Sequence, residues 1–374
     1  MDHTAVIDAD AHVEEDVATW DFLDEEFRDR RPIPVLLEGD QYRPIYGDVN
    51  AYWLIDGRPT NVPVGKGSMI SLTPPISRAA KAKPFSTASQ SLADVGARLS
   101  DMDKVGVTTQ VLFPTVFNRP PTDDDRFLTA LHRSYNTWLA GRCAEAPERL
   151  KWAAVMPLQE VDEAVRELNR AAELGAVAAL CYPMVRGKTL DDRSLYPFYA
   201  EADRLGIPIT VHIGWYSPEL NKLCDNLFTA QTSSLIFPLQ MSFLGIIGSD
   251  LLERFPNLRF AFLEAGASWL LYLVEHMDHY YAVNGAMGWW RPTRSPTDWI
   301  KSGRIYLSFE TDEALLPQVA DFIGEDHLLL STDMPHSELR DNAVSQLAAR
   351  NDLSDEAKRK IRHDNPMRFY GLSV

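Results

Sequence analysis

Two histidines and several carboxylates follow short apolar runs at widely separated points of the chain. Asp10 and His12 come after the first run, His212 ends another, and Glu264 and Asp333 follow two more. Residues two apart in an extended segment point the same way, so Asp10 and His12 can bind one ion together. Imidazole nitrogens and carboxylate oxygens suit Zn, Fe or Mn. We therefore predict a divalent metal held by Asp10, His12, His212 and Asp333.

Each of these residues also has a simpler interpretation, because a polar residue at the end of a strand is more often a loop cap than a ligand. Four such residues occur together here, and two of them are histidines in a chain that has only nine. This combination favours the metal site over four separate loop caps.

Three further residues are candidates for substrate binding. His336 either faces the same pocket or caps the next turn. Arg186 either binds a substrate carboxylate or is a solvated surface arginine. Trp215 follows His212 closely and could form an apolar wall.

These residues need a scaffold that brings distant segments together, and the hydrophobic pattern predicts one. Eight short, β-branched runs read as parallel strands buried on both faces; they are residues 4–9, 107–113, 150–156, 176–181, 207–212, 258–263, 304–309 and 327–332. Amphipathic helical stretches lie between them, at 127–143, 161–174, 195–205, 238–254, 268–281, 312–322 and 341–349.

Eight strands that alternate with helices predict an α/β fold, a (β/α)8 TIM barrel, in which chemistry lies at the carboxyl ends of the strands. A doubly wound open sheet is the alternative, but no GxGxxG turn follows the first strand. We expect residues 1–374 to form one domain. Residues 19–93, rich in Pro, Gly, Tyr and Trp, form a long insertion after strand 1. It either caps the active site or makes a dimer contact.

Composition excludes several classes of partner. The net charge is -16 and no basic block is present, which argues against nucleic acid and anionic membranes. The amino-terminal residues lack the basic-then-apolar order of a signal peptide, and no apolar stretch approaches the ~18 residues that a membrane span needs. Three widely spaced cysteines fit a reducing compartment. We expect a cytoplasmic protein that acts on a small molecule.

Six motifs, in order along the chain, resemble those of the amidohydrolase-2 family, in its aminocarboxymuconate-semialdehyde decarboxylase-like branch. The opening IDADAH at 7–12 resembles the family's D-x-H-x-H. The other matches are DMDKVGV at 101–107 leading to LFPT at 112–115, PITVHIG at 208–214, RFPNL at 254–258 with EAG at 264–266 and Trp269, STDMPH at 331–336, and NPMRFYGL at 365–372.

The resemblance implies a distorted TIM barrel, frequent homodimers, and a metal bound by the residues that correspond to Asp10, His12, His212 and Asp333. This sequence departs from the family in two places. The usual H-x-H is here Asp10-x-His12, whose added negative charge favours Mn or Fe over Zn. The family's decarboxylases usually have a strand-six His that protonates the substrate carbon, and Glu264 stands in its place.

Because a carboxylate beside a metal is a poor acid, Glu264 favours hydrolysis. We predict a metal-dependent hydrolase in which bound water attacks an ester, thioester, amide or lactone. Asp333 is the first choice of catalytic base and Glu264 the second. The alternative is non-oxidative decarboxylation of an aromatic or unsaturated carboxylic acid. A metal-free binding barrel without activity is the third possibility.

Overall fold

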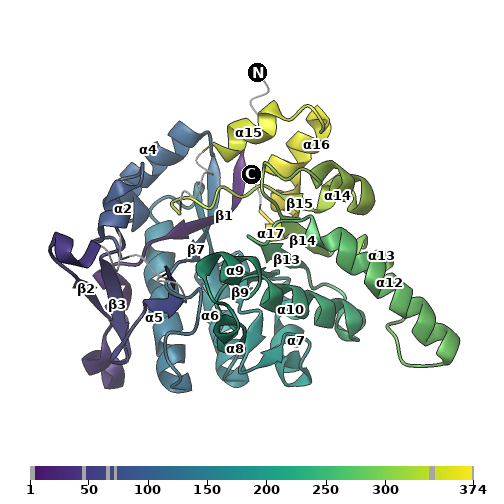
Figure 1. Ribbon diagram of the computed structural model, residues 1–374, viewed down its shortest axis with the longest axis horizontal. Helices are drawn as coiled ribbons and strands as arrows, with labels where there is room; N and C mark the ends of the chain where they lie inside the picture. The colour runs from purple at the N-terminus through teal and green to yellow at the C-terminus, as the bar shows by residue number, and fades with distance from the viewer. Residues whose placement is uncertain (1–4, 44–47, 65–67, 71–73, 337–341, 373–374) are drawn as a thin grey trace.

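Eight parallel strands form a nearly closed barrel in the computed structural model, which describes residues 5–43, 48–64, 68–70, 74–336 and 342–372 (Figure 1). In spatial order they are β1 (Ile7–Val13), β7 (Thr109–Pro114), β8 (Leu150–Val155), β9 (Ala178–Cys181), β12 (Ile209–His212), β13 (Phe260–Leu263), β14 (Ile305–Ser308) and β15 (Leu328–Leu329). Backbone bonds bring the last strand region to the first: Ala9 N donates to Leu330 O (2.9 Å) and Asp333 N donates to Asp10 O (3.1 Å). The TIM-barrel prediction is confirmed.

All eight predicted strands are present with shifted ends, and the first and last differ most from the prediction. β1 continues to Val13, so Asp10 and His12 lie inside the strand and not after it. Its register against β7 shifts between Asp8 and Ala11. β15 is only two residues long, and an irregular segment carries the chain from it to Asp333.

Helices surround the barrel, and the predicted ones are found with shifted ends. They are α5 (Asp125–Cys143), α6 (Val161–Glu173), α7 (Tyr196–Leu205), α10 (Phe237–Gly248), α11 (Leu251–Arg254), α12 (Trp269–Met287), α14 (Leu316–Ile323) and α15 (Ala343–Ala349). The single helix predicted over 238–254 is divided, because Ser249 adopts an extended conformation at the end of α10. α12 extends beyond its predicted end at 281.

Shorter elements complete the barrel's outer layer and its loops. The helices are α4 (Val95–Val105), α8 (Pro218–Lys222), α9 (Leu227–Thr232), α13 (Pro296–Ile300), α16 (Asp355–Arg359) and α17 (Asn365–Tyr370), with the one-turn segments η4 (Arg193–Leu195), η5 (Glu325–His327) and η6 (Lys360–Asp364). A small hairpin, β10 (Met184–Val185) with β11 (Lys188–Thr189), follows β9.

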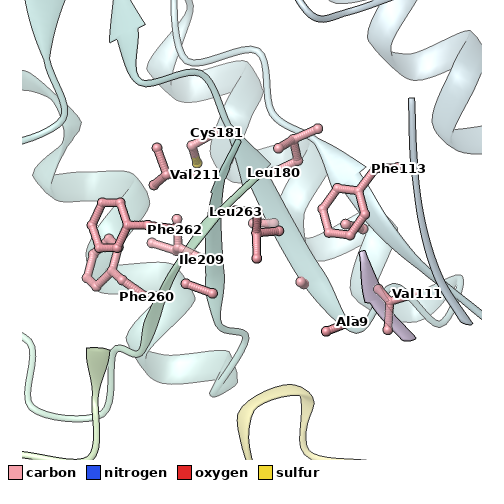
Figure 2. Close-up of a cluster of buried hydrophobic side chains, with 14 of the residues drawn as sticks. Ala9, Val111, Phe113, Leu180, Cys181, Ile209, Val211, Phe260, Phe262 and Leu263 are labelled. Atoms are coloured by element: carbon pink, nitrogen blue, oxygen red, sulfur yellow. The ribbon is translucent and has the colours of Figure 1, made fainter. Parts of the chain in front are cut away.

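Side chains alternate between the two faces of each barrel strand, and Figure 2 shows part of the resulting core. Phe262 packs against Phe243 of α10, with ring centroids 5.2 Å apart, so it faces the helices. Leu263, the next residue, therefore faces the barrel interior and pairs in register with His212. The alternation fixes His212 on the interior face at the carboxyl end of β12.

The insertion at 19–93 shares the barrel's core. It begins within η1 (Val17–Trp20) and contains η2 (Glu25–Arg30), η3 (Asp40–Tyr42), an antiparallel sheet of β2 (Ile33–Leu36), β3 (Ala51–Ile55) and β4 (Arg58–Pro59), a hairpin of β5 (Val62–Val64) and β6 (Ser68–Ile70), and helices α2 (Arg78–Ala82) and α3 (Thr87–Gln90). Trp20 contacts Trp53 and also Phe117, which follows β7. Val64 clusters with Trp215, which follows β12. The insertion thus packs on loops at the carboxyl end of the barrel.

One segment, Leu227–Gly248, is long and apolar enough by composition to span a membrane, with a mean hydropathy of 1.2 in the most apolar window. The expectation that no stretch of this length occurs therefore needs correction. The segment comprises α9 and α10, joined by a turn, and 44% of the window is buried, as in core helices that pass the same test.

Candidate metal centre

Four side chains converge at the carboxyl end of the barrel. Asp10, His12, His212 and Glu264 each offer a ligand atom, and these atoms lie within 4.8 Å of one another. His212 Nε2 is 2.8 Å from Glu264 Oε2 and 3.2 Å from His12 Nε2. His12 Nε2 is 3.5 Å from Asp10 Oδ1. The residues come from β1, β12 and the position directly after β13, so the closed sheet assembles them.

Backbone carbonyls determine which nitrogen of each histidine faces the cluster. His12 Nδ1 lies 2.9 Å from Pro114 O, and His212 Nδ1 lies 2.8 Å from Ile213 O. A carbonyl oxygen can only accept, so each Nδ1 carries the hydrogen. In its neutral form each ring then presents the Nε2 lone pair to the cluster, the arrangement that metal-bound histidines use.

Asp10 fits the same interpretation. It is fully buried, and neither of its carboxylate oxygens accepts a hydrogen bond from the residues that the structure describes. An unsatisfied buried carboxylate is costly unless a cation balances it. With two imidazoles and two carboxylates, the donor set fits a divalent ion.

A second group joins the first through His12. Asp333 Oδ1 is 3.4 Å from His12 Nε2 and 2.9 Å from His336 Nδ1. His336 stacks on His12 with ring centroids 4.3 Å apart, and its Nε2 is 2.7 Å from Thr115 Oγ1. Asp333 and His336 thus lie beside the four-residue group. The structure brings six of the predicted site residues to one place, His336 among them.

The pKa values of the site residues depart from their ordinary values, because the effect of burial competes with that of nearby charged groups. Burial lowers the pKa of His212, but the carboxylates of Asp10 and Glu264 outweigh it and raise this pKa to about 10. Burial acts to raise the pKa of Glu264, yet His212 and the hydrogen bonds from both histidines hold it well below its usual range. Burial lowers the pKa of His12 to about 4. Glu264 is therefore ionised, and its negative charge favours a cation.

Two of the site residues have a backbone conformation that L-residues adopt rarely. Glu264 has φ of 60° and Asp333 has φ of 55°. Regular alternation along β13 would turn Glu264 towards the helices, because Leu263 faces the interior. The left-handed turn directs its side chain to His212 instead. Such positions cost on the order of 1 kcal/mol or more and concentrate at functional sites.

A buried polar network holds the strand ends that carry the ligands. Asp8 accepts hydrogen bonds from Thr332 N (2.9 Å) and Gln110 Nε2 (3.0 Å). Arg98, fully buried, donates to Gln110 Oε1 (2.9 Å), to the backbone oxygen of His12 (3.0 Å) and to that of Met334 (3.2 Å). The network ties β1, β7 and the segment before Asp333 together.

The Amidohydrolase family model matches residues 7–372, which is nearly the whole chain. The chain belongs to the amidohydrolase family. The predicted family is thereby confirmed, and so is the expectation of an enzyme with this fold.

Named relatives of this amidohydrolase are decarboxylases. It is 24% identical over 284 residues to a 2-amino-3-carboxymuconate-6-semialdehyde decarboxylase of Dictyostelium discoideum, covering 75% of this chain and 77% of the relative. It is 26% identical over 296 residues to a gamma-resorcylate decarboxylase of Polaromonas sp., covering 74% and 87%. The structure of a dihydroxybenzoic acid decarboxylase from Polaromonas sp., with bound manganese and 2-nitroresorcinol, superposes with a TM-score of 0.70 at 20% identity, over 98% of this chain and 97% of that one.

These relatives correct the predicted reaction. Hydrolysis was favoured because Glu264 replaces a histidine acid, but the relatives are decarboxylases. The end of strand six is not the only place in the site that can hold a proton. The structure places the pair Asp333 and His336 beside His12, and this pair offers another proton-holding group.

The remaining predicted residues lie apart from the metal cluster. Arg186 is exposed, pairs with Asp125 and lies 3.1 Å from Asp123 O. It lines a cavity of about 470 Å³ together with Trp215, and no residue of the metal cluster lines that cavity. A second cavity, of about 510 Å³, does include Glu264.

Sequence reasoning missed the residues that support the ligands. Asp8 precedes Asp10 by two positions, so the same alternation that paired Asp10 with His12 could have included it. Thr115 directly follows β7, at the barrel's carboxyl end. Arg98 has no such signal, because helix periodicity does not reveal which carbonyls a buried guanidinium will reach.

Proposed function

We propose that this amidohydrolase catalyses the metal-dependent, non-oxidative decarboxylation of an aromatic or unsaturated carboxylic acid. The observation that carries the proposal is the likeness to decarboxylases of two such substrate types over about three quarters of the chain. The buried cluster of imidazoles and carboxylates supports it, because it fits the metal that such a reaction uses.

We assign the metal to Asp10, His12, His212 and Glu264, with Asp333 beside it. A bound divalent ion would supply positive charge that orients the substrate's oxygens and stabilises negative charge during the reaction. Manganese is our proposal for its identity, since the carboxylates around it are hard oxygen ligands. In this assignment Glu264, ionised and close to His212, is a ligand and not the proton donor.

Decarboxylation needs a proton at the carbon that loses its carboxylate. The new C–H bond forms, the C–C bond to the carboxylate breaks, and its electron pair returns to the ring or alkene as carbon dioxide leaves. The chain must therefore hold a proton near the metal, and Asp333 with His336 is the group that we assign.

The hydrogen bonds of Thr115 explain how the pair can hold this proton. Thr115 Oγ1 lies 2.8 Å from Val13 O and 2.7 Å from His336 Nε2, but the hydroxyl has only one hydrogen. When that hydrogen goes to Val13 O, His336 Nε2 must donate to Thr115, and a neutral His336 then accepts at Nδ1. The 2.9 Å contact in that case requires Asp333 to carry the proton. Asp333 is then an acid beside the metal cluster.

The cavity of about 510 Å³ provides room for a ring next to the cluster. Glu264 lines it, and Ile213, Leu235, Phe237 and Trp269 supply apolar surface. Its volume lies in the range of small-molecule sites. These walls suit a planar, unsaturated acid.

We also propose that the enzyme works in the cytoplasm, without nucleic-acid partners. The net charge of -16 and the free cysteines Cys143, Cys181 and Cys224 support this assignment.

A substrate panel tests the reaction. Mn-loaded protein is given hydroxybenzoic acids and unsaturated dicarboxylic acids in D2O, with carbon dioxide release and proton NMR as readouts. We expect one carbon dioxide per turnover and deuterium at the vacated carbon. A parallel panel of aryl esters and lactones is the control. Acid release from that panel, without carbon dioxide from any acid, would contradict the proposal.

A further inference from the structure

The cavity of about 470 Å³ lies outside the metal cluster and is lined by three loops at the carboxyl end of the barrel and by Val64 of the insertion. Arg119 and Asp123 come from the loop after β7, Arg186 from the turn between β10 and β11, and Trp215 and Tyr216 from the loop after β12. No part of the proposed reaction uses this cavity.

The cations around the cavity differ in how they are neutralised. Arg186 pairs with Asp125, and Lys222 pairs with Glu219 at 2.7 Å. Arg119 donates to the backbone oxygen of Thr60 and has no carboxylate partner within the described ranges. Burial lowers its pKa to about 10, and no neighbouring anion opposes that effect.

A largely buried guanidinium without an anion is unfavourable unless something else supplies the charge. Arg98 shows the contrast, because it is fully buried and donates to one side-chain oxygen and two backbone oxygens. Among the residues that the structure describes, Arg119 makes a single such bond, and it lines a cavity. A planar carboxylate matches the guanidinium fork.

An aromatic wall stands next to Arg119 in a fixed position. Trp215 N donates to Asn118 O (2.7 Å), and Tyr216 Oη donates to Phe117 O (2.9 Å). A Cβ at Gly214 would come within 2.2 Å of Asn118 O, so only glycine permits this approach of the two loops. The loop that carries Arg119 and the loop that carries the rings are therefore joined by backbone contacts.

We propose that Arg119, Trp215 and Tyr216 form a second binding site, which takes an aromatic carboxylate with its carboxylate on Arg119 and its ring against the aromatic wall. The site is separate from the metal cluster. Trp215 belongs to a small apolar cluster on which Leu235 packs, and Leu235 lines the other cavity. The ligand is thus bound next to the substrate cavity, with Trp215 and Leu235 between them. The inference does not depend on the decarboxylase assignment.

Calorimetric titration with benzoate tests the site. Benzamide keeps the ring and loses the charge, whereas inorganic phosphate keeps charge and loses the ring. We expect benzoate to bind about tenfold or more tightly than either. Arg119→Gln should weaken this binding about tenfold or more, and Arg119→Lys should weaken it by a smaller factor, because it keeps the charge and loses the fork. Arg186→Gln, in the same cavity but already paired, is the matched control.

The metal cluster is tested separately with His212→Ala. Benzoate binding at Arg119 should persist in this variant. Its stoichiometry should equal that of the part of the parent protein's binding that Arg119→Gln removes. Binding that His212→Ala abolishes and Arg119→Gln leaves intact would overturn the proposal, as would equal affinity for benzamide or phosphate. If Arg119→Gln fails to fold, unchanged binding in Arg119→Lys and Trp215→Leu would overturn it. Because this test measures binding and not turnover, its result can be interpreted even if the decarboxylation assay fails.

Discussion

His12 and His212 can bind a metal because neighbouring carbonyls settle their protonation. Pro114 O and Ile213 O accept both Nδ1 hydrogens, so both Nε2 atoms, 3.2 Å apart, are directed to the cluster. His212, with its pKa raised to about 10, carries a second hydrogen there, 2.8 Å from Glu264. A divalent cation would replace the hydrogen on Nε2 and bind both Nε2 atoms. The chemistry of the site is therefore prepared by backbone atoms that belong to β7 and to the end of β12.

Glu264→Gln distinguishes the two roles that a carboxylate can have at this position. The change keeps the shape and removes the charge, so a ligand role predicts weaker manganese binding by about tenfold or more. Turnover should fall with metal content and recover in part when excess manganese is added. Metal content by mass spectrometry and rate against manganese concentration measure both effects. Full metal content with a rate that manganese does not restore would assign Glu264 to proton transfer instead.

His336→Asn tests the proton held with Asp333. Removing the ring should lower kcat about a hundredfold, as losses of general acids do, because Asp333 loses the partner that exchanges its proton. Manganese content should stay near that of the parent protein, since His336 does not belong to the four-residue group. His276→Asn, on the exposed side of α12, is the control. An unchanged kcat, or a loss that follows lost metal, would remove His336 from the proton path.

At the scale of elements, hydrophobic periodicity was sufficient to predict the barrel strands but not the residues at which they end. Buried parallel strands have continuous apolar sequences, so all eight were predictable. The ends were not, because β1 continues through Asp10 and His12, polar residues that would normally mark a loop. These residues remain in the strand because they face a site that stabilises them. The break between α10 and α11, in contrast, does have a local signal, because Gly248 ends α10 directly before Ser249.

The substrate-binding predictions show the same limit at loops. Arg186 was chosen by its position after strand four, but its charge is already paired with Asp125. Arg119 lies in a proline-containing loop with no periodicity, and its isolation from carboxylates depends on how three loops meet. Contacts between loops depend on tertiary structure and cannot be read from local spacing.

A buried histidine in α5 makes the stability of this element depend on pH. His132 Nε2 lies 2.7 Å from Tyr182 Oη, and burial lowers the pKa of His132 from 6.5 to about 3. Between pH 6.5 and about 3, His132 therefore binds a proton in the unfolded chain but not in the folded chain. The contribution of His132 is fully present above pH 6.5 and is lost as the pH falls towards 3.

His132→Gln removes the titration and keeps a hydrogen-bonding group near Tyr182. The difference in unfolding free energy between parent and variant should shrink as pH falls below 6.5, by up to about 1.4 kcal/mol per pH unit. Urea unfolding at pH 7, 6 and 5 measures it. His279→Gln, exposed on α12, should show no such trend. A constant difference for His132→Gln across this range would contradict the assignment.

The whole molecule consists of a barrel with two additions of different character. The insertion at 19–93 is part of the core, through Trp20 and Trp53, and lies against loops at the catalytic end. We therefore favour the cap over the dimer contact for this segment. The other addition is α12 with the turn that follows, which projects to the right of the barrel in Figure 1. In α12 only Leu270 and Val274 are buried.

The projecting end of α12 and its turn are the surface that we expect to join two copies of the chain. Met287, Trp289 and Trp290 expose 60%, 60% and 66% of their surface, and Tyr280 on the same helix exposes 60%. Large apolar side chains gathered at one place are unfavourable in water and typical of interfaces, where tryptophan contributes most. The protein should therefore be a homodimer by light scattering, and changing both tryptophans to serine should give a monomer. Ile33→Ser, which removes an exposed apolar side chain from the insertion, should leave the dimer intact. If the dimer persists without both tryptophans and dissociates with Ile33→Ser, the contact lies in the insertion instead. A monomeric parent protein would contradict a dimer contact at either surface.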